Sequence, residues 1–388
     1  MAFSSIWLLV FSIPWENVIM VPGVGTISKA LGLPVVLIGI YTVIYSQKVR
    51  FQSIHLLIIV FFVWASITYF WSINQDASQI VVFTFLQLVI MIWLVYQYCT
   101  GVKEVHSLMQ AYVLGTFVAA CATIYSFISG ASVAYQRYAP TGFDANDVAV
   151  IIALGIPMAW YISLNLENKI IIWFYRIFLV VALYGIILTA SRGGFIVSLI
   201  AISYIVLTFK FLSFKSKAWV LFATFLMAIV VIPFVPIESL ARLGTIQSSI
   251  NQGNIGGRVA IWQAGLASLS ESSNWLSLLL GIGAGAFRYA VVPYLGGEHA
   301  AHNVYLCILV ELGAIALLLF AAILTFSVRS AIQMPKLQRK LWLTLLTIWM
   351  VSAFTLNLEW QKDTWLLFGL IAVHSSIIHK TKSLISTS

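Results

Sequence analysis

Three arginines lie next to glycines, and this pairing favours binding of an anion. Arg192 lies in the run Ser191-Arg192-Gly193-Gly194, Arg258 follows Gly256-Gly257, and Arg288 closes a glycine-rich run that starts at Gly281. The guanidinium fork matches phosphate oxygens, and glycine lets a ligand approach the backbone closely. A cation in the first turn of a helix opposes the helix dipole unless an anion shares the site. These arginines are therefore predicted to bind phosphate, the alternatives being boundary arginines that reach the lipid headgroups and a tight turn at the glycine run.

A histidine pair follows in Glu298-His299-Ala300-Ala301-His302-Asn303. Histidine titrates near neutral pH and therefore suits proton transfer. His302 is thus a candidate acid or base, although a histidine at a membrane boundary can equally be a hydrogen-bonded interface residue. A metal shared by His299 and His302 is a weaker alternative, because no second acidic or histidine pair is in view.

Two further residue types bear on chemistry. Glu311 lies in the middle of an apolar run, which makes it a functional candidate, or else the partner of another polar group in the bundle. The three cysteines also lie inside apolar runs, without CxxC or Cys/His spacing. Neither a disulfide framework nor a zinc site is predicted, and no cofactor is.

The elements that must position these residues are membrane helices. Of the 388 residues, 61% are hydrophobic and 9% are charged, which excludes a water-soluble globule. A bilayer crossing needs about 20 apolar residues. We expect an all-α polytopic membrane protein with about twelve such segments, near 3–20, 31–46, 52–71, 78–98, 106–129, 145–164, 170–189, 193–210, 218–235, 302–327, 340–357 and 364–379.

Basic residues set the expected orientation. With both termini in the cytoplasm, about two thirds of the 21 Lys and Arg residues fall on the cytoplasmic side, as the positive-inside rule requires. The net charge of +9 is therefore interpreted as membrane topology, and no nucleic-acid partner is expected.

One long outward connection, 236–301, carries most of the unusual residues inside a single transmembrane domain, 1–388. Within it Val259, Trp262, Leu266 and Leu269 recur at helical spacing, which predicts a short helix that lies in the membrane interface. An earlier outer loop, 137–147, ends in Asp144-Ala145-Asn146-Asp147. It is expected to be a turn with Asp144 or Asn146 as a helix cap.

The order of these motifs resembles the O-antigen ligase and O-antigen polymerase superfamily. The resemblance rests on Asn146-Asp147, on Ser191-Arg192-Gly193-Gly194, and on the stretch from Gly257 to Gly313 with Arg258, Trp262, Phe287, His302-Asn303, Tyr305-Leu306 and Glu311-Leu312-Gly313. In topology it covers the whole chain. It implies a GT-C-type fold that transfers a glycan, without a metal, from undecaprenyl diphosphate to a sugar acceptor at the periplasmic face of the bacterial inner membrane.

Carried over to this chain, the resemblance gives each candidate residue a role. Arg192 and Arg258 would bind the donor diphosphate, and His302 would orient or deprotonate the acceptor hydroxyl. Arg288 and Asn303 would contact the substrates. The acceptor would be lipid A–core in a ligase, or another lipid-linked glycan in a polymerase, and both branches share these motifs.

A twelve-helix transporter of lipid-linked sugars is the alternative from another class, since helix number alone fits it. Against it, the connection Gln47-Lys48-Val49-Arg50 lacks the Gly- and Arg/Asp-rich signature of a major-facilitator carrier. The charged residues also gather at the outer rim and not at mid-membrane.

Overall fold

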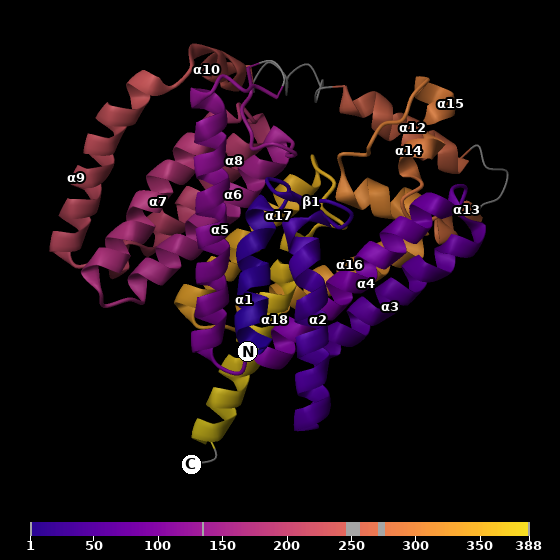
Figure 1. The fold of residues 1–388 in the computed structure, drawn as a ribbon, viewed down its shortest axis with the longest axis horizontal. Coiled ribbons are helices and arrows are strands. Elements are labelled where there is room, and N and C mark those ends of the chain that lie inside the picture. Colours follow the sequence, from indigo (N-terminus) through magenta and orange to yellow (C-terminus); the bar gives the residue numbers. More distant parts are fainter. Residues whose placement is uncertain (1, 134–135, 246–256, 271–275, 387–388) are drawn as a thin grey trace. The chain divides into compact units, whose positions relative to one another are not determined.

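Helices make up nearly all of the computed structural model, which describes residues 2–133, 136–245, 257–270 and 276–386 (Figure 1). One short hairpin, β1 (Met20–Val21) with β2 (Gly25–Thr26), pairs Met20 with Thr26. The α-helices are α1 (Ala2–Ser12), α2 (Ile27–Ser46), α3 (Ser53–Ile67), α4 (Gln75–Tyr98), α5 (Val102–Ile128), α6 (Ala145–Leu164), α7 (Lys169–Leu188), α8 (Arg192–Thr208), α9 (Phe214–Val231), α10 (Ile237–Gly244), α12 (Arg258–Ser270), α13 (Leu276–Leu280), α14 (Phe287–Ala290), α15 (Val292–Leu295), α16 (Val304–Ile332), α17 (Lys336–Ala353) and α18 (Lys362–Ser386). Short 3-10 helices are η1 (Ile13–Trp15), η2 (Thr68–Trp71), η3 (Phe209–Phe211) and η4 (Ile232–Phe234).

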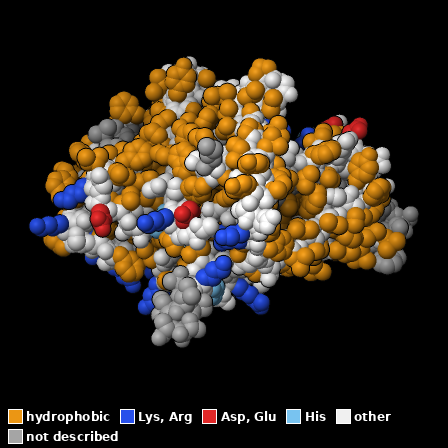
Figure 2. All heavy atoms as spheres, turned by 60° about the horizontal axis from the view of Figure 1, so that its bottom comes forward, with side chains coloured by type: hydrophobic (Ala, Val, Ile, Leu, Met, Phe, Trp, Pro, Cys, Tyr) orange, Lys and Arg blue, Asp and Glu red, His pale blue; other side chains and the backbone are white. Residues whose placement is uncertain are grey.

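The helices bear out the expected all-helical membrane fold. Every one of the twelve predicted segments contains a helix, and among the described residues eight helices are long and apolar enough to cross a membrane. Large apolar side chains such as Phe214, Ile170 and Tyr45 are more than four-fifths exposed, and Figure 2 shows apolar side chains over much of one face. Such a surface suits lipid and not water. The number of crossings stays a prediction.

Two compact units divide the chain. Unit 1 consists of Met1–Tyr45, Cys99–Ile246 and Gln333–Ser352. Its centre is α6, which is buried along nearly its whole length between α5, α7 and α8. Gly155 on α6 lies against Thr116, and Gly194 on α8 lies against Ala149, so closely that a Cβ atom at either glycine would collide. Small residues at these crossings let membrane helices approach each other.

Unit 2 consists of Ser46–Tyr98, Gln247–Ile332 and Ala353–Ser388. Helices α3, α4, α16 and α18 pack together around a cluster of aromatic rings. Phe61, Phe85, Phe320 and Trp365 have ring centroids between 4.8 and 6.5 Å apart. Helices α12 to α15, which lie within the long predicted loop 236–301, pack on one another and on the first turns of α16.

A break in α16 shapes this unit. Gly313 has φ +79° and ψ 178°, so the helical ladder is interrupted there. The carbonyls of Val310 and Glu311 accept hydrogen bonds from the backbone N–H groups of Ile282 and Gly283, at 3.1 and 2.8 Å. The Leu312 carbonyl accepts one from the Trp64 indole at 2.8 Å. In a membrane, irregular backbone is tolerated where protein groups satisfy it in this way.

Candidate functional site

Arg192 is the first residue of α8 in unit 1 and directly precedes the predicted segment 193–210. Ser191 caps the helix, because its hydroxyl accepts the N–H of Gly194 at 3.1 Å. The preceding Ala190 has φ +47°, so the chain turns sharply into the helix. A half-buried guanidinium is thereby held at the helix N-terminus, where the dipole disfavours a cation and favours an anion.

A polar network lies beside this helix start. The Asn146 amide oxygen accepts hydrogen bonds from Arg137 Nη2 at 2.7 Å and from the Ser191 hydroxyl at 2.9 Å. Arg137 Nε also donates to the Thr189 carbonyl at 3.0 Å. Asp144, not Asn146, caps α6, which decides between the two predicted caps. Asn146 thus joins the starts of α6 and α8 into one polar edge that includes Arg192.

Arg258 begins α12 in unit 2, so the predicted cation in the first helical turn is present. Gly257 before it has φ +79°, and Gly256 lies outside the described residues. One turn later Trp262 donates its indole N–H to the Ala301 carbonyl at 2.9 Å. Residues four apart share a helix face. Arg258 therefore lies on the same helix face as Trp262, which is hydrogen-bonded to Ala301, the residue before His302.

The buried face of α12 differs in part from the predicted stripe. Trp262 is half-buried and Leu269 is buried, but Val259 and Leu266 are exposed. Gly265 lies against the Phe287 ring, where a Cβ atom would collide. The side of the helix that packs on α14 thus uses a glycine for close approach, a contact that an apolar repeat does not reveal.

His302 occupies a constrained turn just before α16. Its φ is +48°, and its backbone N–H donates to the Asn357 side-chain oxygen at 2.8 Å. Asn303 caps α16, because its side-chain oxygen accepts the N–H of Leu306 at 3.1 Å. The Asn303 side chain therefore has a structural role at this helix end, and its predicted substrate contact stays a prediction.

The glycine run is a turn laid against the break in α16. Glu311 is buried, and its two carboxyl oxygens accept the N–H groups of Gly285 at 2.7 Å and Phe287 at 3.1 Å. Gly281 and Gly285 have positive φ values, and a Cβ atom at Gly281 would collide with the backbone at Glu311. The polar partners of Glu311 are therefore the backbone N–H groups of Gly285 and Phe287. These contacts fix the backbone directly before Arg288.

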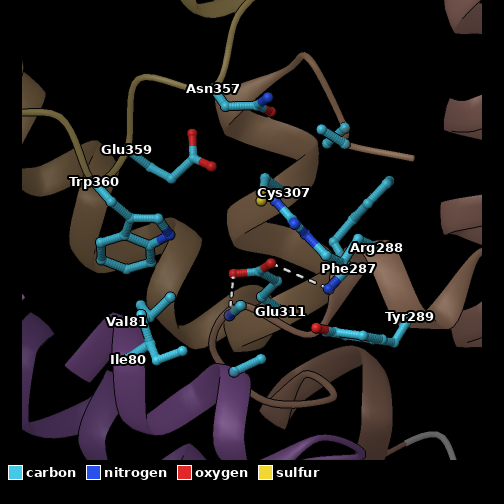
Figure 3. Close-up of a pocket in the computed structure, with 14 residues that line it drawn as sticks. Ile80, Val81, Phe287, Arg288, Tyr289, Cys307, Glu311, Asn357, Glu359 and Trp360 are labelled. Carbon is cyan, nitrogen blue, oxygen red and sulfur yellow. Dashed lines mark hydrogen bonds between the residues drawn. The ribbon is translucent and has the colours of Figure 1, made fainter. Parts of the chain in front are cut away.

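A cavity of about 300 Å³ lies between these elements. Figure 3 shows Glu359 and Trp360 on one side, Arg288 and Tyr289 on the other, and Glu311 between them. The Arg288 guanidinium is close enough to Glu311 to interact with its charge, and the Cys307 thiol interacts with both carboxyl groups. The remaining lining residues are Ala77, Ile80, Val81, Gly285, Phe287, Ala300, Ala301 and Asn357.

The structure thus gathers part of the predicted site. Arg258, Arg288, His302 and Asn303 all belong to unit 2, whereas Arg192 belongs to unit 1. Sequence reasoning missed the segment 357–361, which supplies Asn357, Glu359 and Trp360. Its only signal was an acid and a tryptophan between two apolar runs. Among the described residues, no group of three or more His, Cys, Asp or Glu side chains could hold a metal ion.

The comparisons with known proteins agree with this arrangement. Residues 177–321 match a family model described as O-antigen ligase. A search of curated proteins finds no match to the chain. The matched segment runs from α7 into α16 and contains Arg192, Arg258, Arg288, His302 and Asn303. This match supports the assignment of the chain to the O-antigen ligase and polymerase superfamily.

Proposed function

We propose that this protein is a glycosyltransferase that moves a glycan from undecaprenyl diphosphate to a sugar hydroxyl of lipid A–core. The reaction would take place at the periplasmic face of the bacterial inner membrane. The observation that carries the proposal is the O-antigen ligase match over the segment with all the candidate residues. Arg258 at the start of α12 also supports it, because the Trp262 indole on the same helix is hydrogen-bonded to Ala301, the residue before His302.

In the proposed step, the acceptor oxygen attacks the anomeric carbon of the donor sugar. The bond between that carbon and the diphosphate oxygen breaks, and the lipid diphosphate leaves with the bonding electrons. A single displacement inverts the anomeric carbon. His302 orients the acceptor hydroxyl or takes its proton, and Arg192 and Arg258 stabilise the charge on the leaving oxygen. Guanidinium groups can supply this charge stabilisation without a metal.

A repeat-unit polymerase is the second candidate, because the same family match supports it equally. It differs only in the acceptor, which is then another lipid-linked glycan. A surface-polysaccharide gel separates the two in a deletion strain complemented with the wild-type gene or with His302→Ala. For a ligase, the deletion leaves polymer on undecaprenyl diphosphate and none on lipid A–core, whereas a polymerase deletion leaves core capped by one repeat.

His302→Ala is expected to reproduce the deletion phenotype at normal protein level. An unchanged ladder in the deletion strain would contradict both forms of the proposal and would favour a transporter.

A further inference from the structure

We propose that the unit 2 cavity is a binding subsite for one uncharged pyranose ring, held between Trp360, Glu359 and Arg288. This inference rests on the proposed function and names a part of the substrate that Arg192, Arg258 and His302 do not address. The shared ligand chemistry is a sugar ring with free hydroxyls. It belongs either to the acceptor or to the donor glycan, and the experiment below distinguishes them.

The lining combines the two kinds of surface that a sugar ring presents. A pyranose has an apolar face of C–H groups and a rim of hydroxyls, which both donate and accept hydrogen bonds. Trp360 supplies an aromatic surface whose place is fixed, because its ring packs on Phe85 at 5.2 Å and on Phe61 at 6.4 Å between centroids. Aromatic rings held in this way offer a large apolar contact at low entropic cost.

Charged side chains supply both the hydrogen-bond acceptors and the hydrogen-bond donors that the sugar hydroxyls need. Glu359 can only accept hydrogen bonds when ionised, and Arg288 can only donate them. Both line the cavity, together with the phenol-bearing Tyr289. A sugar hydroxyl can bond to either kind of group, whereas an alkyl chain can bond to neither.

The acidic side chains disfavour a diphosphate in this cavity. Glu311 and Glu359 are each 4% exposed, and both carboxyl groups face the space that Arg288 enters. An anion would therefore meet two acidic groups for a single guanidinium. The same balance disfavours uronic acids and phosphorylated sugars, so we expect an uncharged ring. Arg288 then contacts sugar hydroxyls and not the leaving group.

Size and position complete the argument. Small-molecule sites span about 300–1,000 Å³, and this cavity of about 300 Å³ is at the lower end, which suits one ring and not an oligosaccharide. Asn357 also lines it, and the side-chain oxygen of Asn357 holds the backbone N–H of His302. A ring in the cavity would thus lie beside the residue proposed to handle the reacting hydroxyl.

The first experiment measures binding without requiring transfer. The full chain in nanodiscs is titrated, by saturation-transfer NMR, with oligosaccharides released by mild acid from the core and from the repeat polymer of the producing cells. We expect one of the two to bind. The variants Glu359→Gln and Trp360→Ala should weaken that binding about tenfold or more, as loss of a charged hydrogen bond implies. Trp360→Phe should retain most of it.

Exposed residues provide the controls. Glu167→Gln makes the same chemical change as Glu359→Gln, and Trp219→Ala makes the same change as Trp360→Ala. Both controls should bind as the wild-type protein does. The absence of binding by both oligosaccharides, or equal affinity in wild type and in folded Glu359→Gln, would overturn the subsite.

The second experiment varies donor and acceptor separately in a transfer assay. Glu359→Gln should raise the KM of one substrate about tenfold while kcat changes much less, and the substrate affected is the source of the ring. Binding without any transfer by the wild-type protein would refute the proposed function and leave the subsite standing. Transfer with both KM values unchanged in Glu359→Gln and Trp360→Ala would refute the subsite and leave the function standing.

Discussion

Arg258 places a positive charge at the start of α12, where the helix dipole opposes it. Arg258 follows a glycine in the left-handed region, and its helix is fastened to the turn of His302 through the Trp262 indole. The placement costs a few tenths to one kcal/mol unless an anion shares it. An unfavourable local choice of this kind is expected at functional sites.

The first prediction therefore concerns Arg258. Arg258→Ala should lower the transfer rate about a hundred- to thousandfold, because it removes a fixed cation from the leaving group. Arg258→Lys should be intermediate, since lysine keeps the charge but loses the fork. The rates are measured with a lipid-linked donor, and protein level and membrane insertion are checked by immunoblot. Arg329→Ala, which removes an exposed arginine at the other end of α16, is the control, and equal activity of Arg258→Ala and this control would contradict the role.

The second prediction concerns the buried carboxyl of Glu311. Glu311→Gln replaces one acceptor oxygen by an NH₂ group, which then faces a backbone N–H of Gly285 or Phe287. Loss of that hydrogen bond should lower the stability by roughly 1–3 kcal/mol. The midpoint of thermal unfolding in detergent reports it, and Glu167→Gln on the surface should leave the midpoint unchanged. A midpoint equal to wild type would show that the amide is accommodated.

At the scale of elements, the site depends on two irregular segments that fit each other. The glycine run 281–285 supplies the N–H groups, and the break at Gly313 in α16 supplies the carbonyls. Two backbone hydrogen bonds, from Ile282 to Val310 and from Gly283 to Glu311, thus satisfy groups of both segments at once. In a low-dielectric surrounding an unsatisfied backbone group is costly, so the two should form together or not at all.

The third prediction tests this mutual fit with two glycines of nearly the same φ. Gly281 has φ +73° and faces the backbone of Glu311, whereas Gly296 has φ +72° with open space around it. Gly296→Ala should cost only about 1 kcal/mol for the backbone conformation. Gly281→Ala adds a collision with backbone and should abolish the peak of folded protein in gel filtration. Similar elution profiles for the two variants would mean that the turn can shift away from α16.

The fourth prediction concerns the loop that holds His302. Asn357→Ala removes the oxygen that accepts the backbone N–H of His302, and Asn357→Asp keeps an acceptor there. Small displacements of a reacting group can lower rates up to about a hundredfold, so kcat should fall strongly in the alanine variant and less in the aspartate variant. Steady-state kinetics with matched protein amounts measure both. Equal kcat values in the two variants would contradict the positioning role.

Sequence could locate these elements but not their pairing. Apolar runs of about 20 residues identify helices such as α6 and α16, because the bilayer imposes length and composition. Glu311 stood out for the same reason. The hydrogen bonds from Gly285 to Glu311 and from His302 to Asn357 could not be predicted, because no periodic pattern in the sequence indicates them. Such contacts depend on how helices distant in the sequence pack.

At the scale of the whole molecule, the exposed apolar surface and the basic ends of the helices suit a multi-pass membrane protein. Figure 2 shows Lys and Arg side chains gathered on part of one face, amid apolar surface. We propose that the basic connections lie in the cytoplasm and that the candidate site faces the periplasm, as the charge bias of the sequence indicates.

The fifth prediction tests that orientation. In a chain whose Cys99, Cys121 and Cys307 are replaced by alanine, a new cysteine is placed at the exposed Glu298 or at the exposed Lys336. A membrane-impermeant maleimide added to spheroplasts should label Glu298→Cys only, and labelling of Lys336→Cys should require permeabilised cells. The reverse pattern would invert the proposed topology.

The composition of unit 2 also determines when the cavity can exist during synthesis. Its lining comes from the start of α4, from the segment 285–311 and from residues 357–360, which are separated by long stretches of chain. The ribosome makes Glu359 and Trp360 after all the other residues that line the cavity. Domains fold as units during synthesis, so the proposed sugar-binding cavity can form only after residue 360 has been made. A nascent chain that ends before Glu359 would therefore lack part of the proposed subsite.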